Sequence, residues 1–407
     1  MTKLRILVLI STLLVISTFG TLAFIYAKGY RFDFKKNKIT PNGLLVLKSD
    51  PDGAEIFINE NLKGATNSNF SLEPSTYDVS IRKENYLTWN KRLKIEKEVV
   101  TQATAHLFKV APSLTAITFA NVQNPNLSPD YSKISYIVNP DNNQANNNFG
   151  LWIIEMINLP LGFSRQPRKI TNANLTGANL IWSPNSRQIF VDKGNSSFIL
   201  NIGDFIPEKQ LTNISARKQK IFEEWQKEKT KQLDSKLAKL PSELQDILKR
   251  KASAIVFSPD EDMVLYTASG SAEIKPELIK PIPGASTQKE ERNIKQGKTY
   301  IYDIKEDRNF LITEDEVNLN GWIDYNKIQN NLNLKTISWF PTSRHIILAE
   351  EEKIIIMDYD GTNRQVVYSG NYLFPYVFPT ISFDRLIILT NLGASSTPTN
   401  LYSLGIK

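Results

Sequence analysis

The sequence predicts a mainly β protein with an N-terminal transmembrane helix, and three patterns carry this prediction. Residues 6–27 contain no charged side chain over 22 positions. Residues 43–110 contain short runs that alternate apolar and polar side chains, as half-buried strands do. Residues 111–407 repeat one short motif around a proline. We therefore divide the chain into a tail and anchor (1–27), a basic spacer (28–42), a small β domain (43–110) and a repeat domain (111–407).

Composition sets limits on the class of protein. A chain of 407 residues exceeds the roughly 100–200 residues of one domain, and its apolar content of 41% is sufficient for packed cores. The net charge of +7 favours acidic surfaces as partners, but no basic run is interleaved with aromatic residues, so we expect no nucleic-acid partner. The chain has no cysteine, which excludes disulfides, thiol nucleophiles and cysteine-bound zinc.

The charge-free segment 6–27 predicts an uncleaved anchor in the lipid bilayer. A helix of 22 residues matches the roughly 30 Å hydrocarbon core of a membrane, whereas the apolar core of a signal peptide is usually roughly 7–15 residues long. The flanking charges bear on orientation: Lys3 and Arg5 precede the segment, and five basic residues follow it within 28–38. The positive-inside rule alone would therefore place the bulk of the chain in the cytoplasm.

Four short motifs follow one another in the small β domain. They read Pro-Asp-Gly-Ala at 51–54, Gly-Ala-Thr at 64–66, Leu-Glu-Pro-Ser-Thr-Tyr at 72–77, and Asn-Tyr at 85–86. In this order and spacing they resemble the PEGA domain family. Ser75 and Asn85 replace two glycines of the family pattern. Asn85 is a mild change because asparagine tolerates left-handed backbone angles, whereas Ser75 predicts an altered turn.

The PEGA resemblance implies a small, non-catalytic β-sandwich. Such domains often occur in envelope or surface proteins behind an N-terminal membrane anchor. On this resemblance we expect a single-pass protein of the cell membrane with the bulk of the chain extracytoplasmic, against the result of the charge count.

A longer repeat predicts a β-propeller over residues 111–407. Pro129, Pro184, Pro259 and Pro341 each follow an apolar strand and precede a polar turn, two strands and a short strand that ends in Thr or Ser. A fifth, less well matched copy has Ile381 in place of the proline. Such units bury their apolar faces by stacking in a ring, so we expect about five blades, with six as the alternative. Residues 113–119 would supply the last strand and close the ring.

The Ser-Pro-Asp words at 128–130 and 258–260 resemble those of TolB-like propellers, which belong to the WD-repeat-like group. Each proline would end the inner strand of a blade, because proline lacks the N–H that a strand ladder needs. The aromatic residues Trp182, Phe257 and Trp339 stand two positions before a proline, and we expect them to pack between blades. The alternative is that they line a ligand pocket.

A helical insertion is predicted at about 214–251. Five leucines between 233 and 248 recur at helical spacing, and Ser242 with Gln245 resembles a capping box. Two roles remain open for this arm. It packs against the propeller through its leucines, or it docks a partner protein.

No sequence motif indicates catalysis. His106 and His345 are the chain's two histidines, and neither has a second histidine at metal-ligand spacing. The acidic groups at 260–262, 314–316 and 350–352 are expected at turns, and the Asp-Tyr-Asp-Gly stretch at 358–361 is expected to form a tight turn instead of a calcium site. We therefore expect no catalytic residues, no metal and no cofactor, and the ligand-binding residues are unknown at this stage.

These expectations combine into a membrane-anchored, extracytoplasmic binding or scaffold protein of the cell envelope. Its propeller would recognise a protein or an envelope polysaccharide without catalysis. One alternative is a propeller hydrolase or lyase that acts on envelope glycans through two carboxylates. Another is a sensor or assembly scaffold that binds through the helical arm. The sequence leaves the binding face, the ligand and the oligomeric state open.

Overall fold

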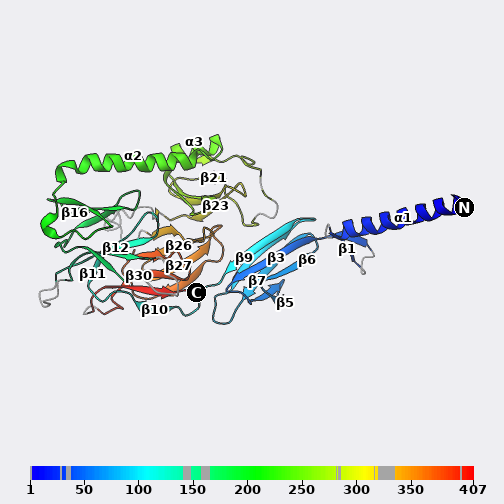
Figure 1. Ribbon diagram of the computed structural model, residues 1–407, viewed down its shortest axis with the longest axis horizontal. Coiled ribbons are helices and arrows are strands. Elements are labelled where there is room, and N and C mark those ends of the chain that lie inside the picture. Colours follow the sequence, from blue (N-terminus) through cyan, green and yellow to red (C-terminus); the bar gives the residue numbers. More distant parts are fainter. Residues whose placement is uncertain are drawn as a thin grey trace. The chain divides into compact units, whose positions relative to one another are not determined.

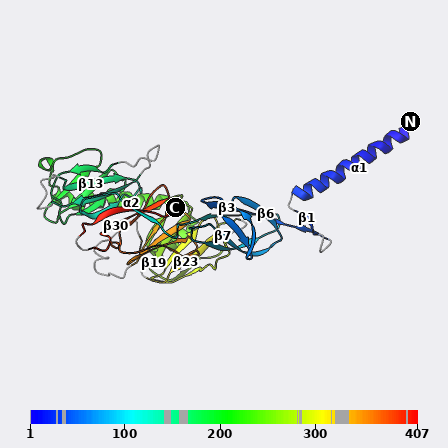
Figure 2. The ribbon, with the colours of Figure 1, turned by 90° about the horizontal axis from the view of Figure 1, so that it is seen from below.

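The computed structural model describes residues 2–27, 30–33, 38–140, 148–156, 166–280, 282, 286–315, 317–319, 335–394 and 397–407. Both views of the ribbon show a long helix at the N-terminus and β-strands through most of the remaining chain (Figure 1 and Figure 2). The chain divides into two compact units. The first comprises residues 1–107 with 280–289, and the second comprises residues 108–279 with 290–407. Each unit is described by itself.

The first helix, α1 (Thr2–Ala27), contains the predicted anchor. Its segment Arg5–Ala27 has 23 residues and a mean hydropathy of 2.3, and none of that segment is buried. A helix of that composition and length is suited to cross a membrane, although a signal sequence has the same properties. A two-stranded hairpin of β1 (Tyr30–Asp33) and β2 (Lys38–Pro41) follows.

Two small sheets face one another in the remainder of the first unit. One has the order β6 (Ser68–Leu72), β3 (Gly43–Asp50) and β9 (Val100–His106), with β3 and β9 parallel. The other has the order β5 (Asn61–Ala65), β4 (Glu55–Ile58), β7 (Ser75–Arg82) and β8 (Trp89–Ile95). Alternate side chains point inward and form one apolar core, which includes Leu45 and Leu47 from one sheet and Ile56 and Ile81 from the other.

The motifs of the small β domain have clear structural roles. Gly53 adopts a left-handed φ of 68°. The buried Thr66 hydroxyl accepts the Ala54 N–H at 2.9 Å and lies 2.6 Å from the Ser49 hydroxyl. Asn85 has a φ of 65°, as its replacement of a glycine predicts. Ser75 begins strand β7 and its φ is not left-handed, so this position does not use the backbone conformation that favours glycine.

The second unit contains five sheets of three to five strands within the described residues. We label these sheets, in chain order, F, G, H, J and E. Sheet F is β11 (Val122–Leu127), β12 (Lys133–Val138), β13 (Gly150–Glu155) and β14 (Arg168–Thr171). Sheet G is β15 (Asn179–Trp182), β16 (Gln188–Asp192) and β17 (Ser197–Asn201). Sheet H is β18 (Ala252–Phe257), β19 (Met263–Ala268), β22 (Thr299–Asp303) and β23 (Arg308–Thr313).

The last two sheets complete the unit. Sheet J is β24 (Val317–Leu319), β25 (Lys335–Trp339), β26 (His345–Glu350), β27 (Lys353–Asp358) and β28 (Gln365–Ser369). Sheet E is β29 (Val377–Pro379), β30 (Arg385–Thr390), β31 (Asn400–Gly405) and β10 (Ser113–Ala116). A short hairpin of β20 (Ala272–Glu273) and β21 (Asn293–Ile294) is inserted in sheet H. The strands within these sheets pair in antiparallel, except that β24 is parallel to β25. Consecutive sheets of this kind are the architecture of a β-propeller, as predicted.

Strand β10 closes the propeller. It pairs with β31 in antiparallel register from Ser113 opposite Gly405 to Ala116 opposite Tyr402. The prediction that residues 113–119 supply the last strand is therefore confirmed for residues 113–116, whereas 117–119 lie beyond the end of the strand. The buried Thr118 strengthens this junction: its hydroxyl donates to Asn400 Oδ1 at 3.1 Å and accepts the Leu401 N–H at 2.9 Å.

The repeated sequence motif forms the same type of turn in all five copies. The residue two positions after the proline, or after Ile381 in the fifth copy, has a left-handed backbone conformation. Its φ lies between 58° and 62° at Tyr131, Ser186, Glu261, Ser343 and Phe383. Its N–H donates to the carbonyl three residues earlier in every copy. Phe383 belongs to the copy without proline, so the predicted fifth copy is confirmed. Two copies also link neighbouring sheets, because the Ser186 and Ser343 hydroxyls accept the backbone N–H groups of Asp130 and Asp260.

One predicted strand is wrong. The sequence predicts a fourth strand at 209–212 in the second copy, but residues Glu208–Gln210 form a short 3-10 helix, η2, and sheet G has three strands. The corresponding strands β14, β23 and β28 form in the other copies and end at Thr171, Thr313 and Ser369, as predicted. Pro207 precedes the 3-10 helix, and the Ile214 N–H then donates to the Ser197 carbonyl on the edge of β17.

The insertion forms two helices, α2 (Lys218–Leu237) and α3 (Ser242–Lys251), preceded by the 3-10 helix η3 (Ser215–Arg217). Its leucines pack on sheet H, in one cluster with Tyr266 and Tyr300. The start of α2 packs on sheet G through Phe222, whose ring lies 4.7 Å from that of Phe190. Figure 1 shows α2 extending from the region of β16 to α3. The predicted capping box is wrong, because Pro241 is the N-cap of α3 and no side chain caps the helix.

Candidate functional site

A cavity of about 820 Å³ lies beneath the middle of α2, within the second unit. The first strands of sheets F, H, J and E line it, together with the turn after β11, and α2 forms a further wall. The helix reaches this position because both of its ends are fixed, one on sheet G and the other on sheet H. A volume of this size is within the range of small-molecule binding sites, roughly 300–1,000 Å³.

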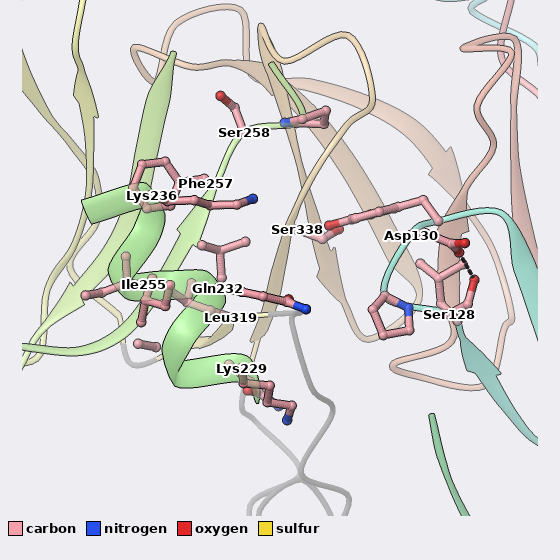
Figure 3. A pocket seen from close by; sticks show the side chains of 18 of the residues that line it. Ser128, Asp130, Lys229, Gln232, Lys236, Ile255, Phe257, Ser258, Leu319 and Ser338 are labelled. Atoms are coloured by element: carbon pink, nitrogen blue, oxygen red, sulfur yellow. Dashed lines mark hydrogen bonds between the residues drawn. The ribbon is translucent and has the colours of Figure 1, made fainter. Parts of the chain in front are cut away.

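Polar side chains of α2 line one side of the cavity. Lys229, Gln232 and Lys236 are spaced by three and four residues, so they lie on one face of the helix. Figure 3 shows Gln232 and Lys236 projecting from the helix toward the side on which Ser338 and Asp130 lie. The cavity therefore has polar groups on opposite walls.

The facing wall includes the turn that holds Asp130. Its carboxylate accepts the Ser128 hydroxyl at 2.6 Å, the Ser132 N–H at 3.0 Å and the Ser132 hydroxyl at 2.7 Å. Burial on its own would raise the pKa of Asp130, but these hydrogen bonds and the Lys133 ammonium at 3.8 Å lower it below the ordinary value. Asp130 therefore remains an anion and serves first to hold its turn.

The two lysines of the cavity have different environments. The Lys236 ammonium lies 3.2 Å from a Glu261 carboxylate oxygen and 5.7 Å from the centre of the Phe257 ring. Partial burial lowers the pKa of Lys229 to about 8. A cation that the fold keeps in a partly desolvated position inside a cavity is a common feature of binding sites, because its interaction with a ligand is screened less by water.

The walls of sheet J add uncharged polar groups. Asn318 of β24 and Ser338 of β25 line the cavity. The Asn318 side-chain nitrogen is buried and has no hydrogen-bond partner in the described structure. A buried amide donor without a partner lowers the stability of the fold.

The three aromatic residues of the repeat have different positions. Trp182 is buried and donates its indole N–H to the Asn126 carbonyl of the neighbouring sheet at 3.1 Å. Trp339 is buried and donates to the Val256 carbonyl at 3.0 Å. The prediction of packing between blades is confirmed for both. It is wrong for Phe257, which packs with the helical arm and lines the cavity.

The histidines lie outside this site. His106 lies 3.8 Å from an Asp50 carboxylate oxygen in the first unit. His345 is buried, with Nδ1 2.8 Å from the Thr342 hydroxyl and Nε2 3.4 Å from the Asp358 carboxylate. The series of contacts from Thr342 to His345 to Asp358 has the residue types of a catalytic triad. However, the cavities of 820 and 390 Å³ are lined by other residues, and the His345 ring packs edge-on against Phe340.

The acidic turns have structural partners. Glu261 pairs with Lys239 at 2.6 Å as well as with Lys236, so this turn fastens the helical arm. At 358–361 the chain makes the predicted tight turn, with Gly361 at a φ of 79°. The Asp360 carboxylate accepts the N–H and the hydroxyl of Thr362. Within the described residues no group of acids and histidines is arranged to hold a metal ion.

Sequence reasoning identified Phe257 through the alternative of a ligand pocket, and it did not identify the polar residues of the cavity. Lys229, Gln232 and Lys236 carry a weak signal, because they recur on one face of the arm beside the leucines. Asn318 and Ser338 carry none, since their role depends on how separate strands meet.

Comparison with known proteins supports the assignment of the small β domain. Residues 42–111 match the PEGA domain family, which confirms the predicted resemblance. No curated protein matches the sequence significantly. The Cps50 (Swd1) β-propeller domain of Myceliophteria thermophila is similar in structure with a TM-score of 0.30 and 9% identity, over 72% of this chain and 100% of that chain.

TolB from Acinetobacter baumannii is similar with a TM-score of 0.20 and 9% identity, over 81% of this chain and 60% of that chain. A TolB propeller, the class that the Ser-Pro-Asp words resemble, is thus among the similar structures. Because both TM-scores are low, the propeller assignment rests on the strand order, the five repeated turns and the pairing of β10 with β31.

Proposed function

We propose that this protein is a membrane-anchored binding protein of the cell envelope. Residues 6–27 anchor the chain in the lipid bilayer, the bulk of the chain is extracytoplasmic, and the propeller binds a ligand in the cavity beneath α2 without catalysis. The observation that carries this proposal is the cavity itself, since an inserted helix and four propeller sheets place polar groups around one space.

Several features support this function. The exposed apolar helix α1 has the length of a membrane span. The PEGA match at 42–111 favours an envelope protein. The leucines of the arm are buried against sheet H, which favours a role of the arm in forming the cavity over a role as a free docking arm.

The alternative of a glycan hydrolase with paired carboxylates has less support. Among the described residues that line the cavity, Asp130 is the sole carboxylate, and its hydrogen bonds hold a turn. Paired-carboxylate chemistry needs a second carboxyl group roughly 5–10 Å away, across the substrate.

The absence of cysteine permits a direct test of the compartment. Asn195→Cys places one thiol at an exposed turn of the second unit, and Lys3→Cys places one before the anchor. Cells with an intact cytoplasmic membrane are treated with a membrane-impermeant maleimide. We expect Asn195→Cys to be labelled before lysis and Lys3→Cys to be labelled only after lysis. The reverse pattern would rule out the proposed location.

A further inference from the structure

We propose that the outer edge of strand β17 in sheet G binds an extended segment of a partner protein as a fourth β-strand. The segment runs antiparallel to β17 and has apolar residues in its middle, with a basic residue before them and an acidic residue after them. This inference goes beyond the proposed function, because it concerns a second site with a protein partner and does not depend on the compartment of the second unit.

Sheet G ends at its third strand. In sheets F, H, J and E the corresponding strand pairs in antiparallel with a further strand, which is β14, β23, β28 or β10. Within the described residues, β17 pairs with β16 alone. An open strand edge presents backbone N–H and C=O groups to which another chain can add a strand.

The register of β17 shows which backbone groups point outward. The Ile202 N–H donates to the Arg187 carbonyl, which fixes the alternation of the ladder between β16 and β17. Ile199 and Asn201 therefore direct their N–H and C=O groups away from β16. In the part of the chain that the structure describes, these four groups have no hydrogen-bond partner. Ile199 is partly exposed and Asn201 is exposed, so another chain can reach them.

The chain itself covers the beginning of this edge. The Ser197 N–H donates to Asn213 Oδ1 at 3.1 Å, and the Ser197 carbonyl accepts the Ile214 N–H at 2.8 Å. The open part of the edge is thus short. A partner would form hydrogen-bonded pairs with Ile199 and Asn201 and leave the edge before Ser197.

A cavity of about 390 Å³ lies along the open edge. Its apolar walls include Phe198 and Ile199 of β17, Leu211 of the following segment, and Ile221 and Trp225 of α2. Neighbouring residues of β17 point to opposite faces of the sheet, so the cavity has apolar side chains on both sides of the edge. An added strand alternates its side chains in the same way. Apolar residues at successive positions of the partner would therefore all be buried.

Two charged side chains line this cavity, Arg217 and Glu224. Both are exposed, and neither has an ion pair among the described residues. Arg217 lies near the beginning of β17, because its N–H donates to the carbonyl of Ile214, the residue that bonds to Ser197. Glu224 follows seven residues later, within α2. A partner on this edge is therefore close to one cation and one anion.

Helix α2 runs along sheet G in the direction of β17. Near its start, the Lys218 ammonium lies 2.5 Å from the Asp192 carboxylate, and Asp192 is opposite the first residue of β17. One turn later, the Phe222 ring packs on Phe190, which is opposite the third residue of β17. The glutamate of the cavity is thus nearer the end of β17 than the arginine. An antiparallel partner would begin near the glutamate and end near the arginine, so a basic residue followed by an acidic one complements both charges.

Fluorescence anisotropy with the full-length protein in detergent tests this proposal. The probe is a labelled peptide with blocked termini and the sequence Lys-Val-Ile-Val-Glu, whose valines would lie opposite Asn201 and Ile199. One comparison peptide exchanges the lysine and the glutamate, and another has N-methyl groups on both valines, which removes two backbone donors. We expect saturable binding of the probe, at least about threefold weaker binding of the exchanged peptide, and at least about tenfold weaker binding of the methylated peptide.

Variants of the protein connect binding to the edge. Ile199→Pro removes an outward N–H that makes no bond within the sheet, and proline is tolerated at such edge positions. We expect it to weaken binding of the probe at least about tenfold. Arg217→Glu should weaken binding at least about threefold. Lys220→Glu is the matched control for this charge change, because Lys220 is exposed on α2 and does not line the cavity, so the affinity should stay within about twofold.

Thermal unfolding verifies that each variant is folded. If Ile199→Pro fails to fold, the methylated peptide and Arg217→Glu still decide the proposal. It would be overturned by absence of saturable binding of the probe, by equal affinity for the methylated peptide, by preference for the exchanged peptide, or by unchanged affinity in both folded variants.

Sedimentation distinguishes a partner protein from a second copy of this chain. We expect the parent protein in detergent to sediment as a monomer. A dimer that Ile199→Pro converts to a monomer would assign the edge to a second copy and would overturn the partner segment. The maleimide labelling decides the compartment separately, so failure of the peptide to bind refutes this inference alone.

Discussion

Lys229 lines the cavity, and the partial burial of its ammonium lowers the stability of the folded protein at neutral pH. Its pKa of about 8 is below the ordinary lysine value of about 10.4, so between these two pH values the unfolded chain binds more protons than the folded chain. Stability therefore rises with pH in this window. The other described charged groups that line the cavity are Lys236 of α2 and Asp130 of the facing turn, and Asp130 stays ionised because its pKa is lowered.

We predict that Lys229→Met raises the midpoint temperature of unfolding at pH 7, because the variant buries no charge and keeps the aliphatic chain. The gain should shrink as the pH rises from 8 to 10, since the parent protein then loses the same charge. Thermal unfolding of both proteins at pH 7, 8, 9 and 10 measures this effect. A variant that is less stable than the parent at every pH would show that the ammonium is already stabilised within the fold.

Asp303 provides a second residue whose charge opposes stability. Its side chain is 1% exposed, and burial raises its pKa to about 6, although the backbone N–H groups of Lys305 and Glu306 and the Arg344 side chain favour the anion. The folded chain thus binds more protons than the unfolded chain between about pH 4 and pH 6, and stability falls as the pH rises through this window.

We expect Asp303→Asn to be more stable than the parent at pH 7 and to lose about half of this advantage at pH 5. Asparagine keeps the oxygen that accepts the two backbone N–H groups and carries no charge. Midpoint temperatures at the two pH values give the comparison. Equal destabilisation at pH 5 and pH 7 would mean that the contact with Arg344 outweighs the cost of burial.

At the level of elements, the sequence predicts the repeat better than the site. Each strand that precedes a proline ends two residues before it, and the copy without proline forms the same turn at Phe383. These features are local, since a left-handed residue and a missing N–H act within a few positions. The strand expected at 209–212 fails because Pro207 and the short 3-10 helix use the residues that would pair with β17.

The cavity could not be predicted because it depends on long-range placement. Asn126, Lys229 and Asn318 meet around one space although about 100 residues separate each from the next. The periodicity of the arm predicts its buried leucines, but not which strands its polar face covers. Phe257 shows the same limit, since its position in the repeat is that of Trp182 and Trp339, and the arm gives it another role.

The junction between β10 and β31 allows a prediction at this scale. Thr118→Val removes a hydroxyl that bonds to Asn400 and to the Leu401 N–H, and it leaves that buried N–H without its partner. We expect a loss of about 1–3 kcal/mol in the free energy of unfolding. Thr115→Val is the matched control on exposed β10, with an expected change within about 0.5 kcal/mol. Denaturant unfolding measures both variants, and equal values would contradict a stabilising role of the junction.

At the scale of the whole molecule, the two units have different proposed roles. The first unit contains the apolar helix α1 and the domain that matches the PEGA family, whose buried side chains form a core of their own. The second unit contains the propeller and the cavity. The cavity exists because inner strands from four sheets of the propeller ring, together with α2, surround it. Closure of that ring is therefore the claim on which the binding function depends most.

A designed disulfide tests ring closure most directly. The chain has no cysteine, and Thr115 lies opposite Ser403 in the β10 and β31 register. The Cα atoms of such pairs are about 4.5–5.5 Å apart, a separation that a disulfide spans. After oxidation of the Thr115→Cys, Ser403→Cys double variant, we predict an intramolecular bond that speeds migration in a non-reducing gel and raises the midpoint temperature of unfolding. Two free thiols in a folded double variant, or bonds between molecules alone, would contradict the closed ring.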